Sequence, residues 1–330
     1  QVGGMSLYGP FFDSAQRVHN SLQLNRGGGY FSDICFYAGV AATDWSWAVL
    51  MSDFDHDGRT DIFVGNGTKR DLGDQDYNYS VQPAAERKPD AYRLIPRSWV
   101  PNAMFRNRNG LQFDTVSNAW GLGDSLVTNG AAMADFDGDG DLDLVLNTTD
   151  PMAVIYRNMA AERGTGSAIL LRLVADLPNR DAIGARVEVH ASGRRWVREL
   201  YGVRGFLSTS QHVVHVGLGS VTTIDSVVVR WPDRTKSVHR DVVVNSTATL
   251  RKANVVPWVP QQRPKPMLED VSDVFQATHR ENFYDDFKRE RLLPYRFSRK
   301  GPGTAVGDVN GDGLHDIIVG GAKYMATQTY

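Results

Sequence analysis

The chain has 330 residues, which is enough for about two domains with hydrophobic cores of their own. A hydrophobic content of 42% with 22% charged residues is typical of a globular protein and excludes a disordered one, while a net charge of −2 gives no electrostatic case for binding nucleic acid or a membrane surface. The sequence has no apolar run of about 18 residues and a single cysteine, Cys35, which excludes a transmembrane helix and an internal disulfide.

The first half of the chain contains an internal repeat. "NSLQLNRGGGYFSDI" from Asn20 resembles "NAMFRNRNGLQFDTV" from Asn102, and "MSDFDHDGRTDIFVGN" from Met51 resembles "MADFDGDGDLDLVLN" from Met133; both pairs are offset by 82 residues. Each unit reads as a hairpin with an Asn-Arg-x-Gly turn, then a strand, an acidic loop and a short apolar strand. Four strands per unit is the content of one β-propeller blade.

The middle of the chain has a different pattern. Between residues 166 and 252 the sequence predicts seven short strands, and alternation such as Val187 and Val189 against Glu188 and His190 indicates half-buried strands. This pattern predicts a compact all-β module, a sandwich being the expected form. A third acidic-loop unit follows, in "VGDVNGDGLHDIIVGG" (306–321). The predicted fold class is therefore all-β, with propeller blades and an intervening sandwich-like module.

These patterns divide the chain into four parts. They are propeller blades over 1–158, the all-β module over 159–253, a Pro-rich linker over 254–266 and the incomplete start of a further repeat region over 267–330. A closed propeller needs about four to eight blades and the sequence shows about three, so we expect a piece of a longer chain or of a larger assembly. The first residues lack the features of a signal peptide. If the protein is exported, we therefore expect this chain to be its mature form or an internal piece.

The acidic loops predict cation sites. Oxygen ligands at alternate positions 1, 3 and 5, a Gly at 6, a backbone carbonyl at 7 and a carboxylate at 9 wrap the chain around a hard cation, and the lack of Cys or His ligands favours Ca²⁺. Up to three structural Ca²⁺ sites are predicted. Their residues are Asp53, Asp55, Asp57, Arg59 and Asp61; Asp135, Asp137, Asp139, Asp141 and Asp143; and Asp308, Asn310, Asp312, Leu314 and Asp316.

Other interpretations of these residues remain open. The acidic loops could be solvated Asp-Gly turns, although three copies with one spacing favour the metal. His212 and His215 are spaced like a ligand pair, but on a strand they face opposite sides, so ordinary sheet histidines are expected. The clustered aspartates are assigned to metal, and no nucleophile–base–acid arrangement emerges, so an enzyme is not predicted.

The residues also carry a family resemblance. The acidic-loop units resemble FG-GAP/VCBS repeats, the blades of integrin-α-like propellers, and the segment from "GARVEVHA" to "VVVRWPDR" resembles the ASPIC/UnbV domain. The order of repeat, ASPIC/UnbV domain and repeat is similar to that of large exported bacterial proteins of the Bacteroidetes type. The resemblance implies calcium loops and a role in adhesion, surface display or ligand binding.

The expected function is that of a secreted, extracellular or cell-surface calcium-binding protein of bacterial origin that acts in adhesion, display or assembly. A protein or glycan ligand is expected at the propeller loops, without nucleic acid binding or membrane insertion. One alternative is a carbohydrate-binding or polysaccharide-processing protein that uses the inserted loops 66–101 and 277–300. Another is a structural subunit of a surface layer or filament.

Overall fold

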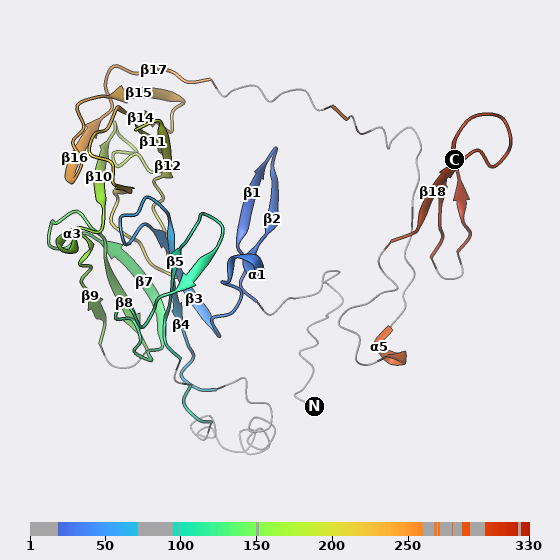
Figure 1. Cartoon of the computed structure of the whole chain (residues 1–330), viewed down its shortest axis with the longest axis horizontal. Helices are drawn as coiled ribbons and strands as arrows, with labels where there is room; N and C mark the ends of the chain where they lie inside the picture. The colour runs from blue at the N-terminus through green and yellow to red at the C-terminus, as the bar shows by residue number, and fades with distance from the viewer. Residues whose placement is uncertain are drawn as a thin grey trace. The chain divides into compact units, whose positions relative to one another are not determined.

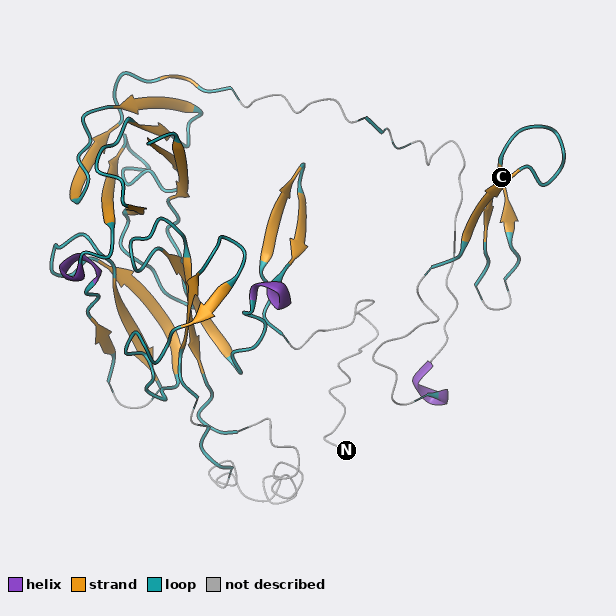
Figure 2. Ribbon diagram, in the orientation of Figure 1, coloured by secondary structure: helices purple, strands orange, loops and turns teal. Residues whose placement is uncertain are grey.

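A computed structural model describes residues 19–71, 95–98, 100–149, 152–259, 267–268, 270, 279, 286–290, 301–322 and 325–330. These residues fall into two compact units, one within 17–261 and the other within 262–330, which are treated separately below. Strands dominate both units and the described helices are single turns, which confirms the all-β class (Figures 1 and 2). No helix in the described ranges is long and apolar enough to cross a membrane. The inserted loops 66–101 and 277–300 lie largely outside the described residues.

The repeat region of the first unit forms three antiparallel sheets. The first is a hairpin of β1 (Gln23–Gly27) and β2 (Tyr30–Asp33), which is followed by the single helical turn α1 (Cys35–Ala38). The second has four strands in the order β3 (Ser46–Ser52), β4 (Asp61–Asn66), β5 (Ala103–Asn107), β6 (Phe113–Thr115). The third consists of β7 (Thr128–Ala134), β8 (Asp143–Thr148) and β9 (Val154–Tyr156).

The sheets group the strands differently from the sequence repeat. Instead of four strands from one unit, the four-stranded sheet takes β3 and β4 from the first unit and the hairpin β5–β6 from the second. The physical reason is the apolar strand that follows each acidic loop. Every residue of β4 is buried, so its backbone groups need partner strands on both edges, and β5 supplies the second one.

Residues 167–257 form two sheets that face each other across one core. The larger sheet has the order β12 (Arg194–Glu199), β11 (Arg186–Ala191), β14 (Ser226–Arg230), β15 (Thr235–His239), β17 (Val256–Pro257). The smaller has β13 (Val214–Gly219), β10 (Ser167–Val174) and β16 (Ser246–Arg251). Side chains from both sheets, such as Val187 and Val216, join one buried cluster, as in a β-sandwich. All seven predicted strands are present, and β17 adds an eighth at the start of the predicted linker.

The repeat region and the sandwich are interlocked. Leu170 and Val213 of the sandwich lie in the same buried cluster as Leu50 of β3 and Leu144 of β8. Hydrogen bonds also cross the junction, for example from the Gly219 amide to the His56 carbonyl (2.8 Å). The sequence boundary at 158/159 therefore separates two parts of one compact unit, which Figure 1 shows with the sandwich next to β7 and β8.

A single substitution should test this junction. A Cβ added at Gly166 would collide with the carbonyl oxygen of His56, a backbone atom that has no freedom to rotate away. We expect Gly166→Ala to lower the free energy of unfolding by about 1–3 kcal/mol, as overpacking does. Gly202→Ala is the matched control, because its Cβ would meet only ordinary contacts with Ile183. Urea denaturation of both variants measures the difference, and equal stability would show that the junction is loosely packed.

The second unit repeats the acidic-loop pattern on a smaller scale. It contains the turn α5 (Asp286–Arg289) and a three-stranded antiparallel sheet of β18 (Thr304–Gly307), β19 (Asp316–Val319) and β20 (Gln328–Thr329). β18 and β19 flank the third acidic loop as β3 and β4 flank the first. β20 pairs with β19 at Ile318 and Val319, the positions that correspond to the β5 pairing of Phe63 and Val64.

Candidate metal centre

The three acidic loops share one hydrogen-bonded conformation. We call residues 53–61 loop 1, residues 135–143 loop 2 and residues 308–316 loop 3. In each loop the first Asp accepts a hydrogen bond from the amide of the sixth residue, a glycine; the pairs are Asp53 with Gly58 (2.7 Å), Asp135 with Gly140 (3.3 Å) and Asp308 with Gly313 (2.9 Å). These glycines have φ between 86° and 95°, which is the left-handed region that glycine adopts without strain.

The carboxylates at the fifth and ninth positions also accept the same backbone hydrogen bonds in all three loops. The fifth residue accepts from the amide of the seventh, in Asp57 with Arg59 (2.9 Å), Asp139 with Asp141 (3.0 Å) and Asp312 with Leu314 (2.7 Å). The ninth residue accepts from the amide of the second, in Asp61 with Phe54 (3.0 Å), Asp143 with Phe136 (2.9 Å) and Asp316 with Val309 (2.9 Å). One spacing thus gives one geometry in both compact units.

In loops 1 and 2 the ninth carboxylate also joins the loop to the chain at or just after the end of the next strand, β5 or β9. The other oxygen of Asp61 accepts from the Asn107 amide at the end of β5 (2.8 Å), and that of Asp143 accepts from the Asn158 amide after β9 (2.8 Å). Asp61 is fully buried and Asp143 nearly so. This bond holds the strand after the loop to its new neighbour, so the ninth residue is a backbone anchor as well as a candidate ligand.

The carboxylates of loops 1 and 2 converge. One oxygen each from Asp53, Asp55 and Asp57 lies within 4.8 Å of the others, and Asp135, Asp137 and Asp143 converge in the same way. Burial and the neighbouring carboxylates raise the pKa of Asp53 to about 8, because its charge lacks sufficient compensation. A set of hard oxygen donors that is short of positive charge fits Ca²⁺. The acidic residues of loop 3 are exposed and form no such convergent trio among the described residues.

The seventh residue of each loop (Arg59, Asp141 or Leu314) was expected to contribute only its backbone carbonyl to a cation. The side chains at this position have other contacts or are exposed. The Arg59 guanidinium pairs with Asp57 (2.5 Å) and donates to the Asn107 carbonyl (3.0 Å), and Leu314 is exposed. Asp141 is fully buried and accepts from the Ala161 amide of the turn α3 (Ala160–Arg163) at 3.2 Å. Burial raises the pKa of Asp141 to about 7. Carbonyl ligation at this position stays a prediction.

Two arginines that the sequence analysis did not single out face the loops. The Arg106 Nε lies 2.5 Å from Asp55, and its Nη2 lies 3.3 Å from Asp57. Arg157 makes the corresponding contacts in loop 2, 2.6 Å from Asp137 and 4.0 Å from Asp139, and also pairs with Glu162. Each arginine directly precedes the asparagine, Asn107 or Asn158, that anchors the ninth carboxylate. This Arg-Asn pair, which follows loops 1 and 2 but not loop 3, was a signal visible in the sequence.

The arginines should weaken calcium binding. Because the Arg106 guanidinium competes for the carboxylates at positions 3 and 5, we expect Arg106→Gln to raise the Ca²⁺ affinity of loop 1 about fivefold, the reduced effect of a screened charge near the surface. Arg108→Gln is the matched control, since Arg108 lies on the same hairpin and pairs with Asp114 instead. Calorimetric titration with CaCl₂ measures both affinities. An unchanged or weaker affinity in Arg106→Gln would contradict the competition.

His212 and His215, which were expected on opposite faces of one strand, lie in different surroundings, because His215 is on β13 whereas His212 lies in a bend before that strand begins at Val214. His215 is buried with its ring centroid 5.2 Å from that of His56 in loop 1, whereas His212 hydrogen-bonds the exposed Asp181 (2.9 Å). Burial lowers the pKa of His215 well below its usual value, so the ring is neutral. They are not a ligand pair.

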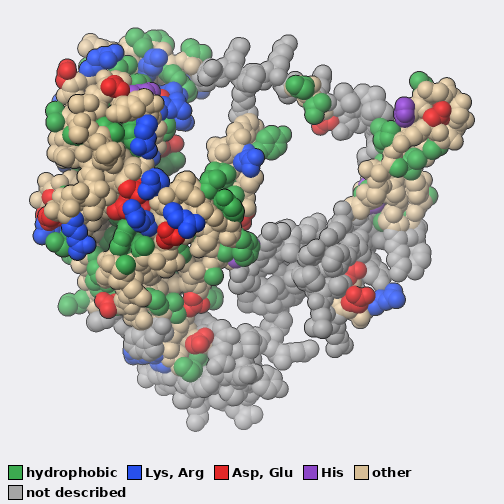
Figure 3. Space-filling view, viewed as in Figure 1, with side chains coloured by type: hydrophobic (Ala, Val, Ile, Leu, Met, Phe, Trp, Pro, Cys, Tyr) green, Lys and Arg blue, Asp and Glu red, His purple; other side chains and the backbone are tan. Residues whose placement is uncertain are grey.

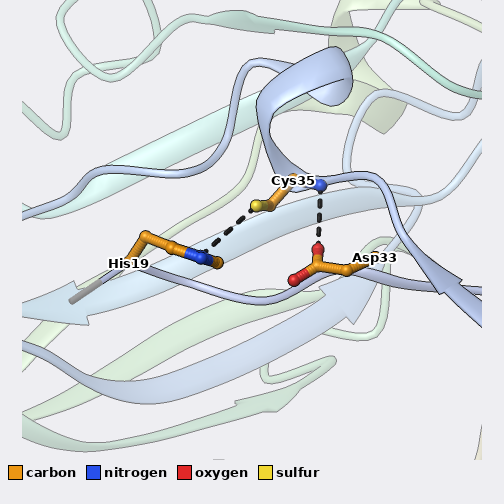
Figure 4. Close-up of side chains that lie close together, drawn as sticks. All are labelled: His19, Asp33 and Cys35. Atoms are coloured by element: carbon orange, nitrogen blue, oxygen red, sulfur yellow. Dashed lines mark hydrogen bonds between the residues drawn. The ribbon is translucent and has the colours of Figure 1, made fainter. Parts of the chain in front are cut away.

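A further cluster lies at the base of the first hairpin (Figure 4). His19 Nδ1 lies 3.4 Å from the Cys35 Sγ, and the Asp33 carboxylate accepts from the Cys35 amide (3.0 Å). Burial raises the pKa of the Cys35 thiol, so it remains protonated, and His19 Nδ1 also contacts the Asn20 carbonyl (2.7 Å). Asp33 further accepts from the Leu22 amide (3.2 Å). These hydrogen bonds stabilise the turn that joins β2 to α1.

Comparison with known proteins places a family match on the sandwich. Residues 175–257 match the family model described as ASPIC and UnbV. The match begins inside the predicted 159–253 module and ends at β17, which agrees with the pairing of this strand in the sandwich.

The chain is also similar to cartilage acidic protein 1. It is 28% identical to the Xenopus tropicalis protein over 274 residues, which cover 70% of this chain and 42% of that protein. It is 28% identical to the human protein, covering 68% of this chain and 38% of that protein, and 29% identical to the mouse protein, covering 68% and 39%. The chain thus spans about two fifths of the length of these relatives. The findings support an ASPIC/UnbV domain over the sandwich, within a chain that is distantly similar to cartilage acidic protein 1.

Proposed function

We propose that this chain belongs to an extracellular protein whose FG-GAP/VCBS-type repeats are stabilised by Ca²⁺. The observation that carries the proposal is the hydrogen-bonded conformation shared by loops 1, 2 and 3. In loops 1 and 2 it directs three carboxylates to one point, and the raised pKa of Asp53 reflects a need for added positive charge. Bound Ca²⁺ would supply that charge and act as a structural ion, while the loop residues hold the ends of adjacent strands.

The proposed architecture is a set of propeller blades. The four-stranded sheet β3–β6 has the strand number and antiparallel order of a blade, and β7–β9 repeats its first three strands. The ASPIC/UnbV domain packs against both sheets through the shared cluster of Leu50, Leu144, Leu170 and Val213. Such an arrangement gives the repeats a rigid frame from which loops can contact a protein or glycan partner in adhesion, surface display or assembly.

The extracellular assignment rests on two supports. The first is the similarity to cartilage acidic protein 1, a name that refers to an extracellular tissue. The second is the need for calcium, because extracellular calcium is concentrated enough to fill sites of modest affinity, which resting cytosol leaves empty. Bacterial origin, implied by the order of the domains, remains part of the same proposal.

Calcium titration of chelator-treated protein tests the proposal. We expect saturable binding of two Ca²⁺ to loops 1 and 2 and weaker binding of a third to loop 3, where the carboxylates are exposed. The double variant Asp55→Asn, Asp57→Asn should lose one ion and leave the others. Replacement of Asp114, an exposed carboxylate on β6, by Asn is the control. A chain that binds no Ca²⁺ at millimolar concentrations would refute the proposal.

A further inference from the structure

A groove lies between the repeat region and the edge of the sandwich. It has a volume of about 520 Å³ and is lined on one side by Val49, Met51 and Thr60, and on the other by β11, β12 and the chain that follows β12. β12 is the edge strand of the five-stranded sheet, and Lys and Arg side chains gather along this side of the sandwich in Figure 3. Both walls belong to the first compact unit.

The groove is positively charged. Arg186, Arg198 and Arg204 line it together with one carboxylate, Glu199. Arg186 pairs with Glu188, which also pairs with Arg195 and Arg230. The carboxylate of Glu199 interacts with the Tyr201 hydroxyl. Among residues 152–259, no ion pair joins Arg198 or Arg204 to a carboxylate. Within the described part of the chain, these two neighbouring guanidinium groups form no ion pair with a carboxylate.

The two arginines are also partly desolvated. The Nη2 atom of Arg198 is buried without a hydrogen-bond partner, and Arg204 donates to the Glu199 carbonyl (3.0 Å) with its guanidinium 5.6 Å from the Tyr201 ring. Burial lowers the pKa of both groups, and the positive charge of Arg204 lowers that of Arg198 further. The Asp53 carboxylate acts on Arg198 through space, but it is engaged by amides of loop 1. Buried charges of one sign are costly unless an ion of the opposite sign compensates them.

A small cavity adjoins the groove at these arginines. It has a volume of about 30 Å³, and Met51, Arg198 and Arg204 line both spaces. Its wall also includes Gln211 and the buried His215, whose Nε2 has no hydrogen-bond partner. A volume of about 30 Å³ is that of one water molecule in the liquid, so the cavity is large enough for a single oxygen atom with its contacts. Arg198 and Arg204 thus both line a space of the size of one oxygen atom with its contacts.

We propose that this groove binds an oxyanionic ligand, with a sulfate group held between the guanidinium groups of Arg198 and Arg204. Planar guanidinium groups bind such oxyanions through paired hydrogen bonds. The body of the ligand lies in the wider part of the groove, where Val49, Met51 and the half-exposed ring of Tyr201 offer apolar contact. The anion can be free or carried by a sugar.

Calorimetric titration of the full chain at saturating Ca²⁺ and low chloride tests this site. The probes are sodium sulfate, N-acetylglucosamine 6-sulfate and uncharged N-acetylglucosamine. We expect saturable binding of both sulfates and none of the neutral sugar. Tighter binding of the sulfated sugar than of sulfate identifies a saccharide ligand, whereas equal affinities identify a site for the ion alone. Absence of sulfate binding, or equal binding of the neutral sugar, would overturn the proposal.

Variants locate the binding. Arg204→Gln should weaken sulfate binding about tenfold or more, and Arg204→Lys should retain part of the affinity because it keeps the charge but loses the planar fork. Arg172→Gln is the matched control, since Arg172 is exposed on β10 and lines neither space. Melting curves confirm that each variant is folded. Equal affinities of folded Arg204→Gln and Arg172→Gln would place the anion elsewhere and refute the site.

Discussion

Removal of calcium is expected to lower the melting temperature of the chain by about 10 °C or more. An ion present at a hundredfold excess over its dissociation constant stabilises the native state by about 2.7 kcal/mol, and we propose one such site in each of loops 1 and 2. For a unit of this size, about 1 kcal/mol corresponds to roughly 2–4 °C. The effect should be cooperative, because both loops anchor strands in the same compact unit. Calorimetry with and without chelator measures it.

Two controls define this result. Added Ca²⁺ should restore the melting temperature, while an equal concentration of Mg²⁺ should restore it less, because Mg²⁺ demands a tighter octahedral geometry and retains its waters. The variant Asp55→Asn, Asp57→Asn should respond to chelator less than the wild type. A melting temperature that chelator leaves unchanged would favour the alternative interpretation of the loops as solvated turns.

Asp61→Ala should destabilise the chain by about 3 kcal/mol even when chelator is present. The two oxygens of Asp61 accept from the amides of Phe54 and Asn107, and both bonds are buried. Each buried amide left without an acceptor costs about 1–3 kcal/mol. The loss does not depend on metal, because the side chain joins the backbone of loop 1 to β5. Urea denaturation in chelator measures the change in the free energy of unfolding.

The control for Asp61 is Asp55, whose carboxylate accepts from an amide of its own loop, that of Asp57, and is not hydrogen-bonded to the backbone of a neighbouring strand in the described residues. Asp55 pairs with the partly exposed Arg106, so Asp55→Asn should change stability in chelator by less than about 1 kcal/mol while weakening Ca²⁺ binding. The two variants thus separate the anchor from the ligand. If Asp61→Ala were as stable as Asp55→Asn in chelator, the anchoring role of the ninth carboxylate would be wrong.

The strands and loops were largely predictable because their signals are local. Alternation at Val187 and Val189 marks a strand that faces a core on one side, and both residues are fully buried; Glu188, expected on the solvent side, is buried as well, beneath the arginines that pair with it. The repeated spacing of Asp, Asp and Gly likewise predicted three equivalent loops, which share their hydrogen bonds. The ASPIC/UnbV assignment was carried by sequence elements within the residues that match the family.

Other features depend on residues far apart in the chain. The repeat does not indicate that β4 pairs with β5 across the insertion 66–101, because the edge that a strand chooses depends on backbone groups and burial that only the folded sheet brings together. Arg198 is 138 residues away from Thr60 along the chain, and no local pattern places them on the walls of one groove. Arg106 contacts Asp55, and the only sequence signal for this contact is that Arg106 directly precedes Asn107.

The sequence by itself determined the all-β class, the seven strands of the sandwich and the three acidic loops, since each follows from residue spacing over fewer than about ten positions. Only the tertiary structure decided how the strands share sheets, that His56 packs on the sandwich and that Arg198 and Arg204 form no ion pair with any described residue. The physical reason is that burial and charge compensation are properties of neighbours in space. In this chain those neighbours come from both the repeats and the sandwich.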